Sequence, residues 1–190
     1  MKNGSRPLAS PLPAIPFAAA RARGLPCAGV LLVVLVPQQR LQVITRRGVW
    51  RVYRVSTAAN GLGSVCGSHA TPPGWHRVVR WIGAGAPGGQ VFRSRLRTRR
   101  VLAPDAWRQP DGADRILSRI LRLAGLEPGV NQGPGVDSYA RYIYLHGTNQ
   151  EQKLGTPASH GCVRLANRDM LELFAFTRRR PTWCWIGNTT

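Results

Sequence analysis

Ser159-His160-Gly161-Cys162-Val163-Arg164 sets a cysteine beside a glycine, a histidine and an arginine. A cysteine attacks an acyl carbon well only as the thiolate, so it needs an imidazole that takes its proton and donors that stabilise the oxyanion. Gly161 allows close approach of a substrate, and the N–H groups of Gly161 and Cys162 are candidate donors. An isolated cysteine is more often a small buried hydrophobe, so its partners decide whether Cys162 is a nucleophile.

His146 is the candidate base for Cys162. It follows the run Tyr142 to Leu145, which has the composition of a buried strand. Gly147 comes next, and its missing side chain would let a backbone carbonyl approach the imidazole and fix its tautomer. The sequence therefore predicts that Cys162 and His146 act as a pair.

Two more polar side chains flank Cys162. His160 shares its face in an extended segment, so it could be a second proton carrier or could only shape the pocket, and we give it a supporting role. Arg164 can bind a carboxylate through two parallel hydrogen bonds, which suits an acidic peptide substrate. Arg164 is therefore the candidate substrate-binding residue.

Most of the remaining chain has the pattern of β-strands. Short runs rich in β-branched, aromatic and leucine residues occur at Val30 to Val36, Leu41 to Thr45, Val49 to Val55, Trp75 to Ile82 and Trp183 to Ile186. The second and third runs are separated by a short turn and are expected to form a hairpin. Glycine and proline punctuate the segment from Ala58 to Gly74, which predicts a long loop.

Two segments are expected to be helical. From Ala113 to Ala124 apolar residues recur at helical spacing, and Gly125 supplies a stop. Asn167 is the candidate N-cap of a second helix that runs through Met170 and Phe174. Both helices are expected to lie on the sheet.

The N-terminal region is ambiguous. Residues 1 to 26 are rich in Pro, Ala and Arg without apolar periodicity, which is typical of a disordered or loosely packed basic extension. Together with the apolar run from Cys27 to Val36 they resemble a signal peptide, but prolines interrupt the basic region and Pro37-Gln38-Gln39 is a poor cleavage site. We prefer to interpret Val30 to Val36 as a buried strand, which leaves no convincing export signal.

Charge and length limit the classes of function. The 190 residues include 27 basic and 8 acidic residues, and the net charge of +19 favours polyanionic partners such as nucleic acids, anionic lipids or acidic cell-wall polymers. The basic residues are nearly all arginine and are scattered, so no nucleic-acid interface is expected. A general compositional bias explains the charge equally well. The length and the hydrophobic content predict one domain.

The four cysteines lack any pair or Cys/His spacing that is typical of a zinc site, so neither a metal nor another cofactor is expected. A disulfide between Cys66 and Cys184 can be drawn, but no pattern supports it.

Several of these segments resemble a known family. His146-Gly147-Thr148, Gly155-Thr156-Pro157-Ala158-Ser159-His160-Gly161-Cys162-Val163-Arg164-Leu165 and Asn167 are similar to the signature of the L,D-transpeptidase catalytic domain of the YkuD type. Upstream, Tyr53-Arg54-Val55-Ser56-Thr57 and Thr71-Pro72-Pro73-Gly74 resemble the strand and the TPxG-like turn that precede the catalytic half of that family. The resemblance covers residues 29 to 187 and leaves out the extension formed by residues 1 to 26.

The resemblance implies a mainly β fold, with a curved sheet or partial β-barrel and flanking helices. It implies that Cys162 is the nucleophile and His146 the proton donor and acceptor. Supporting or oxyanion roles fall to Gly147, Ser159, His160 and Gly161. In such enzymes the thiolate attacks a peptidoglycan stem peptide at the L-centre of its third residue, usually diaminopimelate, and expels the terminal D-alanine. The stem is then held as a thioester until an acceptor amine takes it, in the cell envelope or periplasm.

Two alternatives stay open. Water could take the place of the amine, which would make the chain an L,D-carboxypeptidase or another amide hydrolase, and no short motif identifies the acceptor site. A catalytically inactive protein that binds polyanions is less favoured, because both the nucleophile and the base are present.

Overall fold

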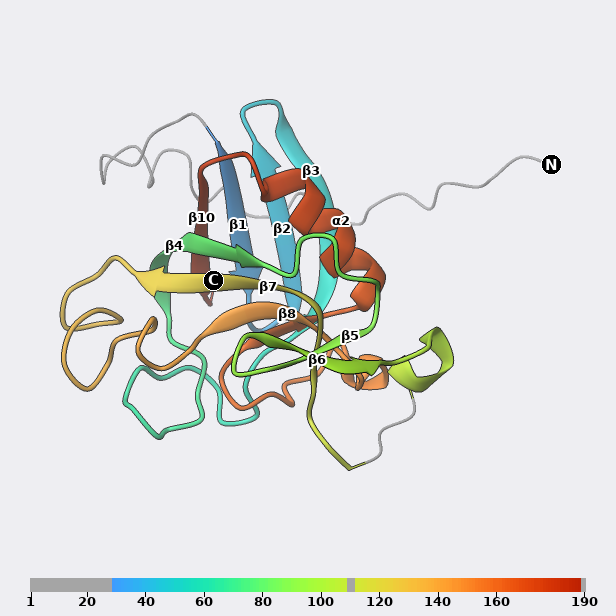
Figure 1. Ribbon diagram of the computed structural model, residues 1–190. Helices are drawn as coiled ribbons and strands as arrows, with labels where there is room; N and C mark the ends of the chain where they lie inside the picture. Colours follow the sequence, from blue (N-terminus) through green and yellow to red (C-terminus); the bar gives the residue numbers. More distant parts are fainter. Residues whose placement is uncertain (1–28, 109–111, 189–190) are drawn as a thin grey trace.

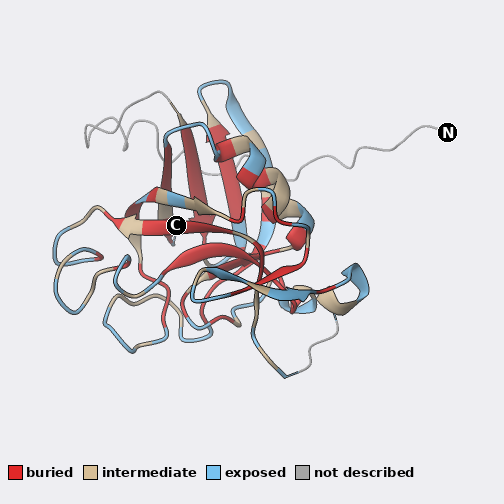
Figure 2. Cartoon of the chain, viewed as in Figure 1, coloured by how far each residue is buried: buried red, intermediate tan, exposed pale blue. Residues whose placement is uncertain are grey.

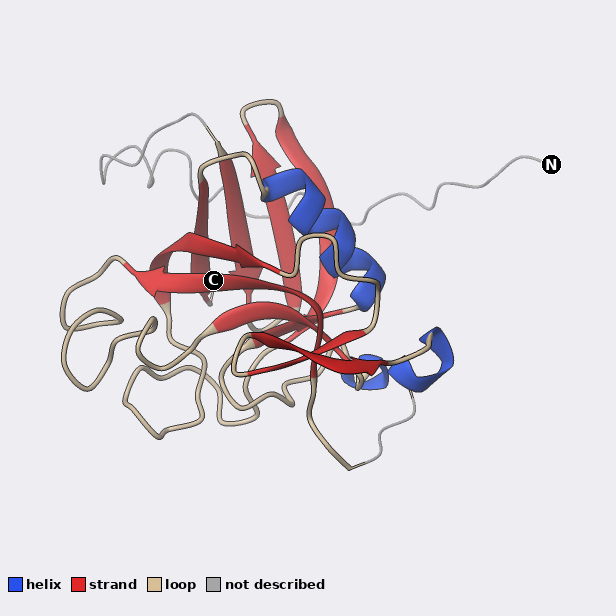
Figure 3. Ribbon diagram, viewed as in Figure 1, coloured by secondary structure: helices blue, strands red, loops and turns tan. Residues whose placement is uncertain are grey.

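The computed structural model describes residues 29–108 and 112–188, and its main feature is one sheet of ten strands (Figures 1 and 3). The strands are β1 (Val30–Leu35), β2 (Arg40–Thr45), β3 (Gly48–Ser56), β4 (Gly74–Ile82), β5 (Gln90–Arg93), β6 (Leu96–Val101), β7 (Ile116–Gly125), β8 (Tyr144–Thr148), β9 (Val163–Leu165) and β10 (Thr182–Gly187). The described helices are α2 (Asn167–Thr177) and two short 3-10 turns, η1 (Pro104–Trp107) and η2 (Glu151–Lys153).

The sheet curves and closes through the pairing of β4 with β7. Its strand order is β4-β10-β1-β2-β3-β9-β8-β7-β5-β6, and β4 also pairs with β7. The join between β3 and β9 is narrow, because only Val55 with Leu165 and Ser56 with Arg164 are in register there. Helix α2 packs on β7 and β8 beside this narrow join (Figure 1). The predicted mainly β fold with a partial barrel is therefore confirmed.

Strand β1 is buried along its whole length, which explains its continuous apolar sequence (Figure 2). It pairs with β2 on one side and runs parallel to β10 on the other. Leu32 and Val34 belong to the main core, whereas Leu31 and Val33 pack on the opposite face with Trp75. A strand buried on both faces has no polar side to alternate with, and the interpretation of this run as a core strand is confirmed.

The helix predicted from Ala113 to Ala124 is wrong, because the chain forms strand β7 there. Leu121 points into the main core, and Ile120 packs with Tyr144 on the other face. A bulge shifts the register between Leu117 and Ile120. Burial on both faces together with a bulge produced an apolar spacing that imitates a helix.

Other expectations need smaller adjustments. The hairpin of β2 and β3, the long loop before β4, and strands β4 and β10 are confirmed. Helix α2 is also confirmed, but Ala166 is its N-cap and Asn167 is its first residue. Glu151 accepts hydrogen bonds from the Asn167 N–H and side-chain amide instead. The extension predicted for residues 1 to 26 lies outside the described residues.

Candidate active site

Strands β8 and β9 bring the predicted nucleophile and base together. They run parallel, with Leu145 opposite Val163 and His146 opposite Arg164. Leu145 and Val163 face the main core. Because side chains alternate between the faces of a sheet, His146 and Arg164 share the other face with Cys162, which immediately precedes β9. Cys162 and His146 are therefore diagonal neighbours on this face.

The environment of His146 keeps its imidazole neutral. The residue is 3% exposed, and burial is the main cause that lowers its pKa to about 4. Its Nδ1 lies 2.8 Å from the Gly147 carbonyl oxygen, so Nδ1–H donates there and Nε2 is left as the acceptor. This is the tautomer that a general base needs.

Gly147 has a second purpose that the sequence did not reveal. A Cβ at this position would collide with the side-chain oxygen of Asn167 and lie 2.8 Å from the Leu117 carbonyl oxygen. The carbonyl that orients His146 belongs to Gly147 itself. Glycine is thus required for the close packing of β8 against β7 and α2 behind the imidazole.

Cys162 is partly exposed, and the other described cysteines, Cys66 and Cys184, are also free thiols. The Cys162 Sγ lies 3.5 Å from the Tyr142 carbonyl oxygen. Desolvation is the main cause that raises the pKa of Cys162 to about 11, although a hydrogen bond from the Tyr144 backbone and the charge of Arg164 lower it. The resting thiol is therefore protonated and needs a base. No disulfide joins Cys66 and Cys184.

Ser159 shapes the turn that presents Cys162. Its hydroxyl donates to the Cys162 carbonyl oxygen at 2.6 Å and accepts the Gly161 N–H at 3.2 Å. Gly161 has φ +127°, a conformation that side chains disfavour, and a Cβ there would press on the Ala70 carbonyl oxygen. The Gly161 N–H, one of the two predicted oxyanion donors, is occupied by Ser159.

Asp114 organises the far side of the site and was not identified from the sequence. Its carboxylate pairs with the Arg164 guanidinium and lies 3.2 Å from the His160 Nδ1. Arg164 is 1% exposed and also donates to Gln150. Asp114 lies 46 residues from His160 and 50 residues from Arg164 in the sequence, so no short motif links it to them. Arg164, the predicted substrate-binding residue, is thus already paired with the Asp114 carboxylate of the same chain.

Arg141 ties the long loop before β4 to the loop that ends at Tyr142. Its guanidinium donates to the carbonyl oxygens of Gly63, Ser64 and Ala70 at 2.7 to 3.1 Å. The positive charge of Arg141 also lowers the pKa of the Cys162 thiol. The loop that the sequence predicted is therefore held next to the thiol.

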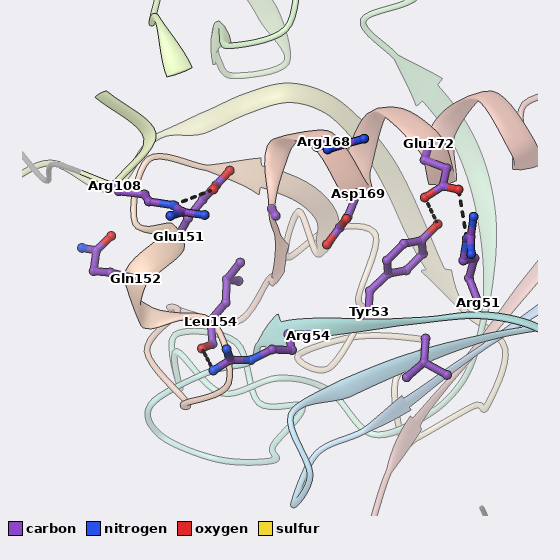
Figure 4. Close-up of a pocket in the computed structure, with 12 residues that line it drawn as sticks. Arg51, Tyr53, Arg54, Arg108, Glu151, Gln152, Leu154, Arg168, Asp169 and Glu172 are labelled. Carbon is purple, nitrogen blue, oxygen red and sulfur yellow. Dashed lines mark hydrogen bonds and ion pairs between the residues drawn. The ribbon is translucent and has the colours of Figure 1, made fainter. Parts of the chain in front are cut away.

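A separate hollow of about 980 Å³ lies between β3, η2 and the start of α2 (Figure 4). Its lining includes neither Cys162 nor His146. Glu172 pairs with Arg51 at 3.0 Å and accepts a hydrogen bond from the Tyr53 hydroxyl, and Arg54 donates to the Leu154 carbonyl oxygen. The close-up shows Glu172 turned toward Tyr53 and Arg51, and Arg54 turned toward Leu154. Because neither Cys162 nor His146 lines the hollow, it is not part of the candidate active site.

Within residues 29–108 and 112–188, no group of three or more His, Cys, Asp or Glu side chains could hold a metal ion. No helix in this part of the chain is long and apolar enough to cross a membrane.

Comparison with known proteins gives one family. Residues 29–186 match the model of the L,D-transpeptidase catalytic domain, YkuD. Among solved structures, L,D-transpeptidase 3 from Mycobacterium tuberculosis with a faropenem-derived adduct is 15% identical, with a TM-score of 0.52 over 85% of this chain and 61% of that one. An L,D-transpeptidase from Xylanimonas cellulosilytica is 18% identical, with a TM-score of 0.49 over 90% and 68%.

An L,D-transpeptidase from Mycobacterium smegmatis is 15% identical, with a TM-score of 0.49 over 84% of this chain and 59% of that one. The chain thus spans less than two thirds of the length of that structure. The match to L,D-transpeptidase 3, with its TM-score of 0.52, supports a shared fold. No curated protein matches the chain.

Proposed function

Because this chain belongs to the family of L,D-transpeptidase catalytic domains, we propose that it is a cysteine-dependent acyltransferase that acts on peptidoglycan stem peptides. The observation that carries the proposal is the neutral pair on one face of β8 and β9. The Cys162 thiol is protonated, and the neutral His146 presents Nε2 as an acceptor. A thiol and an imidazole in these states are ready for general-base attack on an acyl carbon.

In the proposed reaction His146 Nε2 takes the thiol proton while Sγ forms a bond to the carbonyl carbon at the L-centre of the third stem residue. The tetrahedral intermediate collapses as the C–N bond to the terminal D-alanine breaks. The imidazolium returns its proton to that departing amine, and the stem remains as a thioester on Cys162. An acceptor amine then attacks the thioester and restores the thiol. The identity of this amine is left open.

The surrounding residues receive roles that follow from their contacts. We assign the oxyanion to the Cys162 N–H, since the Gly161 N–H is bonded to Ser159. Ser159 acts by holding the turn around Cys162. Arg164 is buried against Asp114, so we propose that it supports the site from behind and does not touch the substrate.

Peptidoglycan stems as the substrate imply that the protein works in the cell envelope or periplasm. Its net charge of +19 would favour contact with anionic envelope polymers. The carboxypeptidase reaction uses the same residues, with water in place of the amine, so only the products separate the two.

The proposal is tested with a tetrapeptide stem and purified protein. Cys162→Ala should abolish D-alanine release while the circular dichroism spectrum and unfolding midpoint stay close to the original. The matched control is Cys66→Ala, which removes an exposed thiol and should retain activity. Adding an amine acceptor and analysing products by mass spectrometry distinguishes a cross-linked stem from a hydrolysed tripeptide. D-alanine release by folded Cys162→Ala protein would refute the nucleophile.

A further inference from the structure

Two arginines near the proposed nucleophile retain unused hydrogen-bond donors. Arg122 lies on β7 directly opposite Tyr144 of β8. Tyr144 in turn packs in one cluster with Cys162. Since residues in register share a face of the sheet, Arg122 faces the same side as the thiol. Arg122 and Cys162 therefore lie on one face of the sheet.

Arg122 is 7% exposed, yet it has no carboxylate partner among the described residues. Its Cζ lies 3.4 Å from the Tyr139 ring centroid and 5.2 Å from the Tyr142 ring centroid. One terminal nitrogen donates to the Tyr139 carbonyl oxygen at 2.9 Å. The Nε is buried and has no hydrogen-bond partner in the described part of the chain. A buried donor without a partner costs free energy, which a bound acceptor would recover.

Arg95 also contacts the Tyr142 ring. Its Cζ lies 4.6 Å from the Tyr142 ring centroid, and its Nη1 donates to the Tyr144 hydroxyl at 3.1 Å. Arg95 is partly exposed, and no Asp or Glu of the described residues pairs with it. Tyr142, a residue that is 52% exposed, thus contacts two guanidinium groups that have no carboxylate partner among the described residues.

Two other arginines, Arg141 and Arg164, lower the pKa of Cys162 by their charge, and both already donate hydrogen bonds within the protein. The Arg141 guanidinium donates hydrogen bonds to four oxygens of the long loop before β4. Arg164 donates to Asp114 and Gln150; its Nε lacks a partner, as that of Arg122 does, but at 1% exposure the side chain is closed to a ligand from solvent. Among these described arginines around Cys162, Arg95 and Arg122 therefore remain for an anion that enters from outside.

We propose that Arg95 and Arg122, joined by the Tyr142 ring, form a subsite for a carboxylate of the stem peptide. A guanidinium binds a carboxylate through charge-assisted hydrogen bonds that its planar fork favours, and low exposure strengthens them. The inference rests on the proposed function, because it assumes a stem peptide as the substrate. Such a stem offers two carboxylates near the scissile bond, one on the terminal D-alanine and one on the D-centre of diaminopimelate.

The test measures binding without turnover, by titrating Cys162→Ala protein calorimetrically with three peptides. These are the free tetrapeptide stem, the stem amidated at the terminal D-alanine, and the stem amidated at the D-centre. Amidating the carboxylate that occupies the subsite should weaken binding about tenfold or more. Amidating the other carboxylate should change the affinity little, which identifies the source.

Arginine variants then connect this loss to the subsite. Arg95→Gln in the Cys162→Ala background should weaken binding of the free stem about tenfold and leave the affinity of the sensitive amide unchanged, because the lost partners are the same. Arg122→Gln should do the same, and Arg95→Gln carries the test if the more buried Arg122 variant fails to fold. Arg99→Gln is the matched control, since Arg99 is exposed on β6.

Equal affinity for all three peptides, or equal losses from Arg95→Gln and Arg99→Gln, would overturn the subsite. The failure of the proposed function has a different signature, namely no D-alanine release by the unmodified protein. If the stem does not bind Cys162→Ala protein at all, the subsite is also refuted.

Discussion

At the scale of single residues, the central feature is that the proposed nucleophile and the proposed base are both neutral at rest. Desolvation moves the two groups in opposite directions: it raises the pKa of the partly exposed Cys162 to about 11 and lowers the pKa of the buried His146 to about 4. Each group is thus in the form that proton transfer during attack requires. The other histidine of the motif, His160, is exposed, and its Nδ1 lies 3.2 Å from the Asp114 carboxylate.

The two histidines should therefore differ in their effect on rate. His146→Ala should lower the rate of thioester formation by about 10² to 10⁴, the usual contribution of a general base. His160→Ala should cost less, because it removes an exposed side chain that contacts Asp114. Single-turnover D-alanine release measures both. A greater loss from His160→Ala would transfer the role of the base to His160.

The pKa values also determine how the rate depends on pH. Below about pH 4 His146 is protonated and cannot accept the thiol proton, so the rate should fall there. Above that pH the base is available while the thiol stays protonated up to about pH 11. The single-turnover rate should therefore be nearly flat from pH 6 to pH 9. A tenfold rise per pH unit in that range would mean that a free thiolate with an ordinary pKa attacks.

The sequence identified the residues that sit in its motif, and the structure brings Cys162, His146, Gly161 and Ser159 to one turn and one strand face. The sequence could not identify Asp114 or Arg122, because register and loop packing bring them to the site from distant parts of the chain. Arg164 stays a candidate substrate-binding residue by its chemistry and its place in the motif. The burial of its side chain against Asp114, which no pattern of letters reveals, is the observation that favours a supporting role instead.

At the scale of elements, β7 shows the limit of periodicity. Central strands have neighbours on both edges and apolar contacts on both faces, so their sequences lose the alternation that marks a strand. In β7 the bulge at Ser118 shifts the alternation further, with Ser118 at φ +65°. The runs that became β1, β2, β3, β4 and β10 carried enough β-branched and aromatic residues to be predicted.

Ser118 should be important for the stability of this bulge. Its hydroxyl donates to the Asn167 side-chain oxygen at 2.6 Å and accepts the Gly89 N–H at 3.0 Å. Ser118→Ala leaves both partners buried without this bond and should lower the free energy of unfolding by about 1 to 3 kcal/mol. Denaturant unfolding measures it. Ser94→Ala is the control, since Ser94 also has positive φ but is exposed, and equal losses from the two variants would contradict this role.

At the scale of the whole molecule, the two ends of the chain complete the sheet together. β1 lies between β2 and β10, so the first described strand holds the last one in register. The site lies on strands β8 and β9, farther along the same sheet. The fold that presents Cys162 therefore depends on residues at the opposite end of the sequence.

Truncation tests this dependence and the nature of the N-terminal region. A chain without residues 1 to 26 should be folded and active, because every described strand remains. A chain without residues 1 to 36 lacks β1, which exposes the edges of β2 and β10 and removes a buried apolar strand, so it should aggregate. Size-exclusion chromatography and D-alanine release measure both. A folded, active protein that begins at Pro37 would refute the core-strand interpretation and favour a cleaved signal.

The most direct test of Cys162 as an acyl-accepting nucleophile is a trapped acyl-enzyme. Folded protein is incubated with a carbapenem, whose strained lactam carbonyl is an activated acyl donor, and is then examined by intact mass and peptide mapping. The account predicts one adduct, on the peptide that contains Cys162, and none on Cys27, Cys66 or Cys184. It also predicts that His146→Ala slows the formation of this adduct. An unmodified Cys162, or an adduct confined to another cysteine, would contradict the account.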